Sequence, residues 1–192
     1  MKLSANDHER IRAATSKAET QTNVRFAVVI VPTSDRYAHY PLIWGAAFAL
    51  MIGAALSFLS PALSIRYAIL IELAAFVTFA LFFDWRPLRL LLAPKRAKHL
   101  HARNLAHREF AARILSPGDH RDGLLFFVSL AERYVEILAT RDIHSKVGNA
   151  AWNAIVTDFV AAAKNGHIAG GAISATEACS HYLLSPSSFD LT

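Results

Sequence analysis

Two long apolar runs in the first half of the chain constrain its fold more than any other feature. Residues 42–60 form a 19-residue run without a charged side chain, and at the helical rise they span about 28 Å, enough to cross the hydrocarbon core of a bilayer. A run of the same length, residues 67–85, follows after Pro61, which disfavours continued helix. The sequence therefore predicts a transmembrane helical hairpin over residues 40–85.

Basic residues crowd the side to which the second run returns. They are Arg86, Arg89, Lys95, Arg96, Lys98 and Arg103, whereas the turn of the hairpin carries Arg66 as its one basic side chain. Positive charge marks the cytoplasmic flank of a membrane span and attracts anionic lipid headgroups. We therefore expect two spans with both termini in the cytoplasm, and membrane lipid as a partner of these six side chains.

The net charge of the whole chain also favours a membrane surface as partner. A net charge of +5 is compatible with a nucleic-acid partner as well as with a membrane surface. Most of the excess lies next to the apolar run, and no helix-turn-helix, zinc finger or RNP motif is present. We expect no nucleic-acid partner.

Glu72 is the one acidic residue inside the hairpin before its exit. A carboxylate at the bilayer centre costs on the order of 2–3 kcal/mol on insertion scales. Arg66 lies less than two turns away, so one interpretation is that Glu72 extends toward the outer face beside it. The other interpretation is that Glu72 binds a proton or a partner within the membrane.

The remaining sequence alternates helix and strand patterns. It predicts helices over 5–21, 102–114, 149–165 and 168–184, and strands over 24–31, 123–129 and 133–139. The short link before residue 133 implies that the last two strands form an antiparallel hairpin. These patterns predict one α/β domain, built from residues 1–36 and 86–192 and split by the inserted hairpin at 40–85.

Several stretches of this pattern resemble the TPM domain family, and more narrowly its bacterial membrane branch with an inserted transmembrane hairpin. The first stretch has the form LSxxDxxRIxxAxxxAExxT, and the most specific one is FVSLAERYVEI within residues 123–139. The matching residues outside these are Lys146, Val147 and Trp152. The resemblance covers almost the whole chain. It implies an α/β/α sandwich that is anchored in the inner membrane of a bacterium by the inserted hairpin.

The resemblance also implies functions. Some TPM relatives have been described as acid phosphatases and some are thought to bind calcium, while bacterial relatives are described beside LemA-like membrane proteins. A LemA-like protein or a larger membrane complex is therefore an expected partner. Relatives follow the last strand with a glycine-rich acidic G-x-G-L-E-G segment, whereas this chain has ATRDIHSK at residues 139–146.

Three residues are candidates for phosphate-ester hydrolysis, which needs a cationic clamp and a group that activates a nucleophile. Asp35 follows the first strand, Asp142 follows the last, and His144 lies close to Asp142. The two carboxylates meet at one edge of the sheet if these strands are neighbours. Asx residues at strand ends also form turns, which is the alternative reading of both.

Metal and thiol chemistry receive little support. None of the nine histidines forms an HExxH or finger pattern, so no metal site is expected, and calcium enters only through the resemblance. The lone Cys179 lies in an apolar helix and is expected to be a packed thiol. The leading hypothesis is a membrane-anchored, non-enzymatic interaction or assembly protein. The alternative is a phosphatase-like hydrolase.

Overall fold

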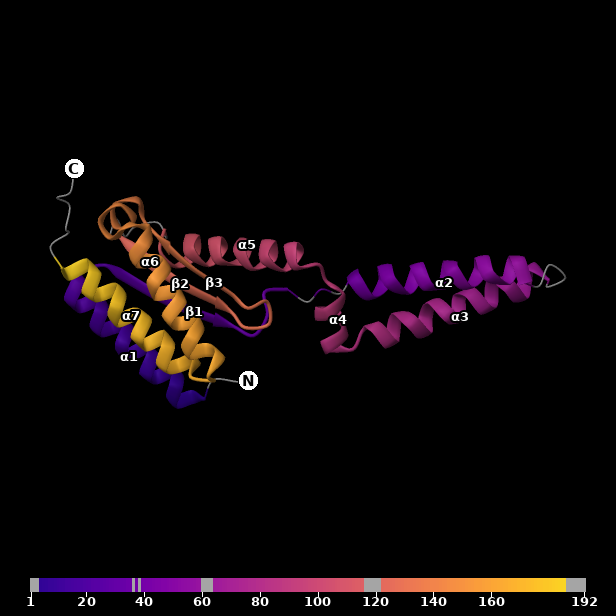
Figure 1. Ribbon diagram of the computed structural model, residues 1–192, viewed down its shortest axis with the longest axis horizontal. Coiled ribbons are helices and arrows are strands. Elements are labelled where there is room, and N and C mark those ends of the chain that lie inside the picture. The colour runs from indigo at the N-terminus through magenta and orange to yellow at the C-terminus, as the bar shows by residue number, and fades with distance from the viewer. Residues whose placement is uncertain (1–3, 36, 38, 60–63, 116–121, 186–192) are drawn as a thin grey trace. The chain divides into compact units, whose positions relative to one another are not determined.

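The computed structural model describes residues 4–35, 37, 39–59, 64–115 and 122–185. Its contacts divide the chain into two compact units: residues 1–34 together with 99–192, and residues 35–98. In chain order the elements, drawn in Figure 1, are α1 (Ala5–Thr22), β1 (Arg25–Val31), α2 (His39–Leu59), α3 (Ile65–Phe83), α4 (Arg86–Leu92), α5 (Lys95–Arg113), β2 (Gly123–Ser129), β3 (Tyr134–Ala139), α6 (Arg141–Lys164) and α7 (Ile168–Leu184). The predicted mixed α/β class is confirmed, and helix predominates.

The first unit is built on a three-stranded sheet with the order β1-β2-β3. β1 is parallel to β2, with Arg25 opposite Gly123 and Val31 opposite Ser129. β2 is antiparallel to β3, with Leu124 opposite Ala139, so the predicted hairpin of the last two strands is confirmed. All seven residues of the central strand β2 are buried, as a continuous apolar run in a strand covered on both faces requires.

Alternate residues of the strands enter two different apolar clusters. One cluster joins α1, α6 and α7 to one face of the sheet through Phe26, Leu124, Phe126 and Val128. The other joins α5 to the opposite face through Val29, Leu125 and Phe127, where the buried alanines of α5 allow close approach. Figure 1 shows α1 beside α7 on one side of the sheet and α5 on the other. The side-chain period of two in a strand thus distributes the core over both faces.

The helix ends of this unit follow local rules, with one departure. α1 starts with a capping box, because Ser4 Oγ accepts from the Asp7 amide at 3.2 Å and the Asp7 carboxylate accepts from the Ser4 amide at 3.0 Å. α6 begins at Arg141, whereas the sequence predicts a helix only from residue 149. Gly148, with φ of 73°, kinks α6 and separates the unpredicted first two turns from the predicted helix. No glycine or proline lies between Thr140 and Gly148, so nothing stops a helix there.

The second unit contains the helical pair α2 and α3, and the short helix α4, which the sequence does not predict. Phe48 of α2 stacks on Phe79 of α3 with ring centroids 5.2 Å apart. A Cβ atom on Gly45 would lie 3.1 Å from the Ala80 amide nitrogen, so this glycine permits the close approach of the two helices. Large apolar side chains remain exposed along both helices, including Phe58 at 86%. α2 and α3 are long and apolar enough to cross a membrane, and the turn predicted around Pro61 lies outside the described residues.

Candidate functional site

The most heavily hydrogen-bonded carboxylate among the described residues belongs to Glu132, in the link between β2 and β3. Its side chain is buried at 6% exposure. Oε1 accepts from the Thr33 hydroxyl at 3.1 Å, from the Ser34 hydroxyl at 2.9 Å and from the Ser34 amide at 3.0 Å. Oε2 accepts from the hydroxyl of Ser129, the last residue of β2. A buried carboxylate is tolerated because donors replace its lost hydration.

This cluster ties together two parts of the chain that are distant in sequence. Thr33 and Ser34 follow β1, and the amides of Leu130 and Ala131 also donate to Val31 and Pro32, each at 3.0 Å. The link between β2 and β3 therefore holds the segment that leaves β1 and leads toward the apolar hairpin in sequence. Sequence reasoning treated this link only as a turn. The available signal was a charged residue three positions after a lone serine that ends an apolar strand.

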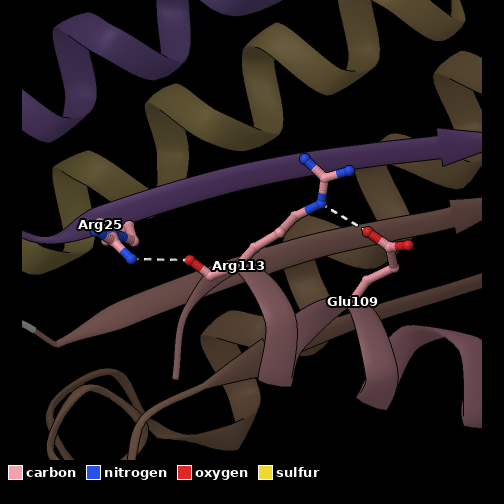
Figure 2. A network of polar contacts seen from close by, with 3 residues as sticks. All are labelled: Arg25, Glu109 and Arg113. Carbon is pink, nitrogen blue, oxygen red and sulfur yellow. Dashed lines mark hydrogen bonds and ion pairs between the residues drawn. The ribbon is translucent and has the colours of Figure 1, made fainter. Parts of the chain in front are cut away.

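The opposite end of the sheet has its own polar contacts. The Arg25 guanidinium donates to the Arg113 carbonyl oxygen at 3.0 Å, at the last residue of α5 (Figure 2). Arg113 Nε donates to Glu109 Oε2 at 2.6 Å within the same helix (Figure 2). The Thr140 hydroxyl donates to Asp122 Oδ1 at 2.8 Å. These contacts join α5, β1 and the ends of β2 and β3, and they satisfy polar groups at a helix C-terminus.

The strand order bears on the predicted catalytic residues Asp35 and Asp142. β2 separates β1 from β3, so the condition that the first and last strands are neighbours is not met. β1 ends at Val31 opposite Ser129, and β3 ends at Ala139 opposite Leu124, which are the two opposite ends of the sheet. Asp35 follows the first of these ends and Asp142 the second. The condition under which the two carboxylates would meet at one edge of the sheet is therefore not met, because β2 lies between β1 and β3 and β3 runs antiparallel to both.

Asp142 and His144 instead lie in the first turns of α6. Both side chains are exposed, and the Ser145 hydroxyl donates to the Asp142 carbonyl oxygen at 2.9 Å. Asp142 occupies the first turn of the helix, where a negative side chain is stabilised by the helix dipole. This structural role accounts for an aspartate at residue 142 without a catalytic role. The catalytic roles expected of Asp142 and His144 stay predictions.

A row of basic side chains runs along α5 next to β3. The His99 ring contacts the Tyr134 ring edge-on at a centroid distance of 5.6 Å, and Arg103 Nε lies 3.5 Å from His107 Nε2. The Tyr134 hydroxyl donates to Glu136 Oε2 at 2.9 Å. Burial, and then the bond to this carboxylate, raise the pKa of Tyr134 above its ordinary value. Tyr134 is thus a neutral donor that holds Glu136.

The other predicted lipid-facing residues lie at the start of α5 and in α4. Lys95, Arg96 and Lys98 occupy the first turn of α5, and the first two are exposed. Arg89 of α4 is half-buried and forms an ion pair with Asp84, which follows α3. The side chain of Arg86 lies outside the described part of the chain. The contact of these residues with lipid stays a prediction.

Glu72 packs between the two long helices. A Cβ atom on Gly53 would lie 3.1 Å from both Cδ and Oε2 of Glu72, so the carboxyl group of α3 rests against the bare backbone of α2. Within the described residues this carboxyl group has no hydrogen bond and no ion pair, with Arg66 or any other side chain. Gly53 therefore makes room for the carboxyl group without supplying a donor.

The described residues do not fit a calcium ion. Calcium takes about six to eight oxygen ligands, several of them from carboxylates. No three His, Cys, Asp or Glu side chains come together as potential ligands in the described ranges. At Glu132 the carboxylate already accepts hydrogen bonds from three hydroxyls and an amide.

The lone cysteine is a packed side chain. Cys179 is buried in α7 at 1% exposure, within the cluster that joins α1, α6 and α7 to the sheet. Burial raises the pKa of its thiol to about 12. A neutral, enclosed thiol is a poor nucleophile, in agreement with the expectation from sequence.

Comparison with known proteins identifies one region of the chain. In these comparisons neither a curated protein nor a solved structure matches the chain. Residues 98–182 match the family model of the TPM domain. The matched range covers most of α5, both strands of the antiparallel hairpin, α6 and most of α7, and it leaves out α1 and β1, which complete the same compact unit. The chain therefore contains a TPM domain at residues 98–182.

Proposed function

We propose that this chain is a membrane-anchored TPM-like protein that binds or helps to assemble another membrane protein. In this proposal the TPM-like unit is an α/β/α sandwich split by the inserted hairpin α2–α3, as in the bacterial membrane branch of the family. The hairpin spans the inner membrane twice, and both termini lie in the cytoplasm. The length and apolar surface of α2 and α3, and the basic residues that follow them, support this topology.

The observation that carries the proposal is the placement of Glu72. Its carboxyl group lies against Gly53 in the middle of an apolar helical pair, and no described residue donates to it. A polar group in hydrocarbon without a partner costs free energy, and such residues in membrane spans usually face a partner or a pathway. A helix of a second membrane protein with a hydrogen-bond donor would supply what this chain lacks.

Lipid is the second proposed partner. Lys95, Arg96 and Arg103 of α5 are exposed, and the helix follows the second span closely in sequence. Each basic side chain near an anionic surface contributes about 1 kcal/mol to membrane binding. We propose that these residues contact anionic headgroups and orient the TPM domain on the membrane surface.

The alternative, a phosphatase-like hydrolase, rests on the family match and on the candidates Asp35, Asp142 and His144. It predicts release of phosphate from an aryl phosphate substrate by the detergent-purified chain, and loss of that release in Asp142→Ala. Equal background release in the wild type and in Asp35→Ala and Asp142→Ala would remove this alternative.

The test of the main proposal is affinity purification of the full chain from membranes in mild detergent, with mass spectrometry of what is retained. We expect one stoichiometric membrane protein with the wild type, and about tenfold less of it with Glu72→Leu. Thr78→Val is the matched control, because the Thr78 hydroxyl donates to the Ala74 carbonyl of its own helix at 2.8 Å. Absence of a stoichiometric membrane protein, or equal recovery with Glu72→Leu, would contradict the proposal.

A further inference from the structure

β3 forms an edge of the sheet, and its outward backbone groups can be identified. The Thr140 amide donates to the Gly123 carbonyl at 3.0 Å, in register with the β2–β3 pairing. Backbone groups point alternately to the two sides of a strand. The amides of Tyr134, Glu136 and Leu138 therefore point toward β2, and those of Val135, Ile137 and Ala139 point away from it. No described residue forms a hydrogen bond with these three outward amides.

The opposite edge of the sheet, formed by β1, is partly covered by a side chain. The Leu130 amide donates to the Val31 carbonyl, so the backbone groups of Phe26, Val28 and Ile30 point outward from β1. The first of these amides, that of Phe26, donates to Glu19 Oε1 of α1 at 2.9 Å. A side chain thus blocks the start of the β1 edge. Proteins commonly protect exposed strand edges in such ways, and on β3 the described residues provide no equivalent.

Charges flank the β3 edge on both ends. Arg133 precedes the strand, Arg141 follows it, and both side chains are exposed and unpaired among the described residues. Between them the side chains of Val135, Ile137 and Ala139 are apolar and half-buried on the α6 side. The acidic Glu136 is held by the Tyr134 hydroxyl on the α5 side. The residues whose backbone groups point outward are therefore apolar, and a positive charge lies beyond each end of the strand.

This charge pattern selects the occupant. A second copy pairing antiparallel about a two-fold axis at Ile137 would place Arg133 opposite Arg141 of the other copy, and like charges directly opposite are destabilising. An extended segment with an acidic residue at each end has the complementary pattern. Strand addition to a sheet edge is a common mode of peptide recognition, with backbone hydrogen bonds for affinity and side chains for specificity.

We propose that the outer edge of β3 binds an extended apolar segment of a partner protein, flanked by acidic residues, as a fourth strand of the sheet. This inference rests on the proposed function, because both assume a protein partner. It adds which surface of this chain binds the partner and what kind of segment is bound. It is independent of Glu72, because β3 belongs to the other compact unit.

The test uses the full chain in detergent micelles and two labelled peptides of alternating valine and threonine, one with an aspartate and one with a lysine at each end. We expect the aspartate-ended peptide to bind at least about tenfold more tightly by fluorescence anisotropy. Ile137→Pro removes an outward amide while leaving the β2 pairing in place, and it should weaken this binding about tenfold. Val28→Pro, at the other edge, is the matched control and should leave binding unchanged.

Charge reversal provides a second variant in case proline disturbs the sheet. The double variant Arg133→Glu with Arg141→Glu should prefer the lysine-ended peptide, whereas Arg108→Glu on α5 should not change the preference. Equal binding of both peptides, or equal loss in Val28→Pro and Ile137→Pro, would overturn the proposal. Dimerisation of the purified chain that Ile137→Pro abolishes would overturn the choice of occupant. Because no membrane partner is needed, failure of this assay leaves the proposed function standing, and failure to recover a partner leaves the edge proposal standing.

Discussion

Two glutamates, one in each compact unit, are treated by the fold in opposite ways. Glu132 in the TPM-domain unit is buried and accepts hydrogen bonds from Thr33, Ser34 and Ser129. Glu72 in the helical pair lies against Gly53, and no described residue donates to it. The first carboxylate has all its donors within the chain. The second has space but no donor among the residues that the structure describes, and we propose that a partner helix supplies one.

The apolar side chains of the two units differ in the same sense. In the sheet unit, Phe126 and Phe127 are fully buried between helices on both faces. In the helical pair, Leu50, Met51 and Phe58 are exposed. The sheet unit buries these side chains within its own core. The helical pair needs an apolar solvent or partner for its surface, and lipid is the one we propose.

Core truncation should produce the largest difference between the units. Phe126→Ala removes a ring that packs edge-on against Phe159 at 5.0 Å, and it should destabilise the sheet unit by about 3–5 kcal/mol. Met51→Ala, at an exposed position of α2, should leave the sheet unit unchanged. Hydrogen exchange of the β2 amides in detergent micelles measures both. Similar loss of protection in the two variants would show that the units are not independent.

Removing the acceptor at Glu132 should have the next largest effect. Glu132→Leu removes the acceptor of the buried Ser129 hydroxyl and of the half-buried Ser34 amide and hydroxyl, and we expect a loss of roughly 2–3 kcal/mol. Glu136→Leu is the control, since its carboxylate accepts from the single Tyr134 hydroxyl and should cost about 1 kcal/mol. Denaturant titration of the full chain, followed by circular dichroism, gives the comparison. A larger cost at Glu136 would contradict the role assigned to Glu132.

Substitutions at Gly53 and Glu72, which are in steric contact, should have a smaller effect than the loss of the Glu132 acceptor. A Cβ atom at residue 53 would lie 3.1 Å from the Glu72 carboxyl group, so the larger side chain of Gly53→Val must displace that group and should weaken the packing of α2 on α3 by about 1–3 kcal/mol. Glu72→Ala removes the obstacle, and the double variant should recover about 1 kcal/mol of that loss. Paired fluorescent labels on α2 and α3 measure the proximity of the two helices in bicelles, in the wild type, both single variants and the double variant. Strict additivity of the two substitutions would show that the carboxyl group does not occupy this space.

The smallest effect is expected at the start of α1. The Ser4 amide and hydroxyl donate to the Asp7 carboxylate and lower its pKa below the usual 3.8. A lowered pKa in the folded state means that this stabilisation is complete above pH 3.8 and is lost as the pH falls through the folded value. Asp7→Asn should therefore differ from the wild type in thermal stability near neutral pH and approach it in acid. A difference that grows on acidification would contradict the sign.

Local patterns predicted most of the elements. The strand at 123–129, the antiparallel hairpin after it and the helix at 168–184 follow from residue type and period, and the structure has them at those positions. The first two turns of α6 were missed because a polar segment without apolar periodicity gives no helix signal, and their end depends on the positive φ of Gly148. The residues proposed for catalysis were chosen by position after a strand, and that position says nothing about which strands are neighbours.

By itself the sequence determined the two apolar helices, the buried central strand and the mixed α/β class, because each depends on residues close together in the chain. Only the tertiary structure decided which distant groups meet. It pairs β1 in parallel with β2, brings Ser34 to Glu132 across 98 residues of sequence, and sets Glu72 against Gly53. The physical reason is that hydrogen bonds and packing between such groups require the whole chain to fold, and residue spacing carries no record of that geometry.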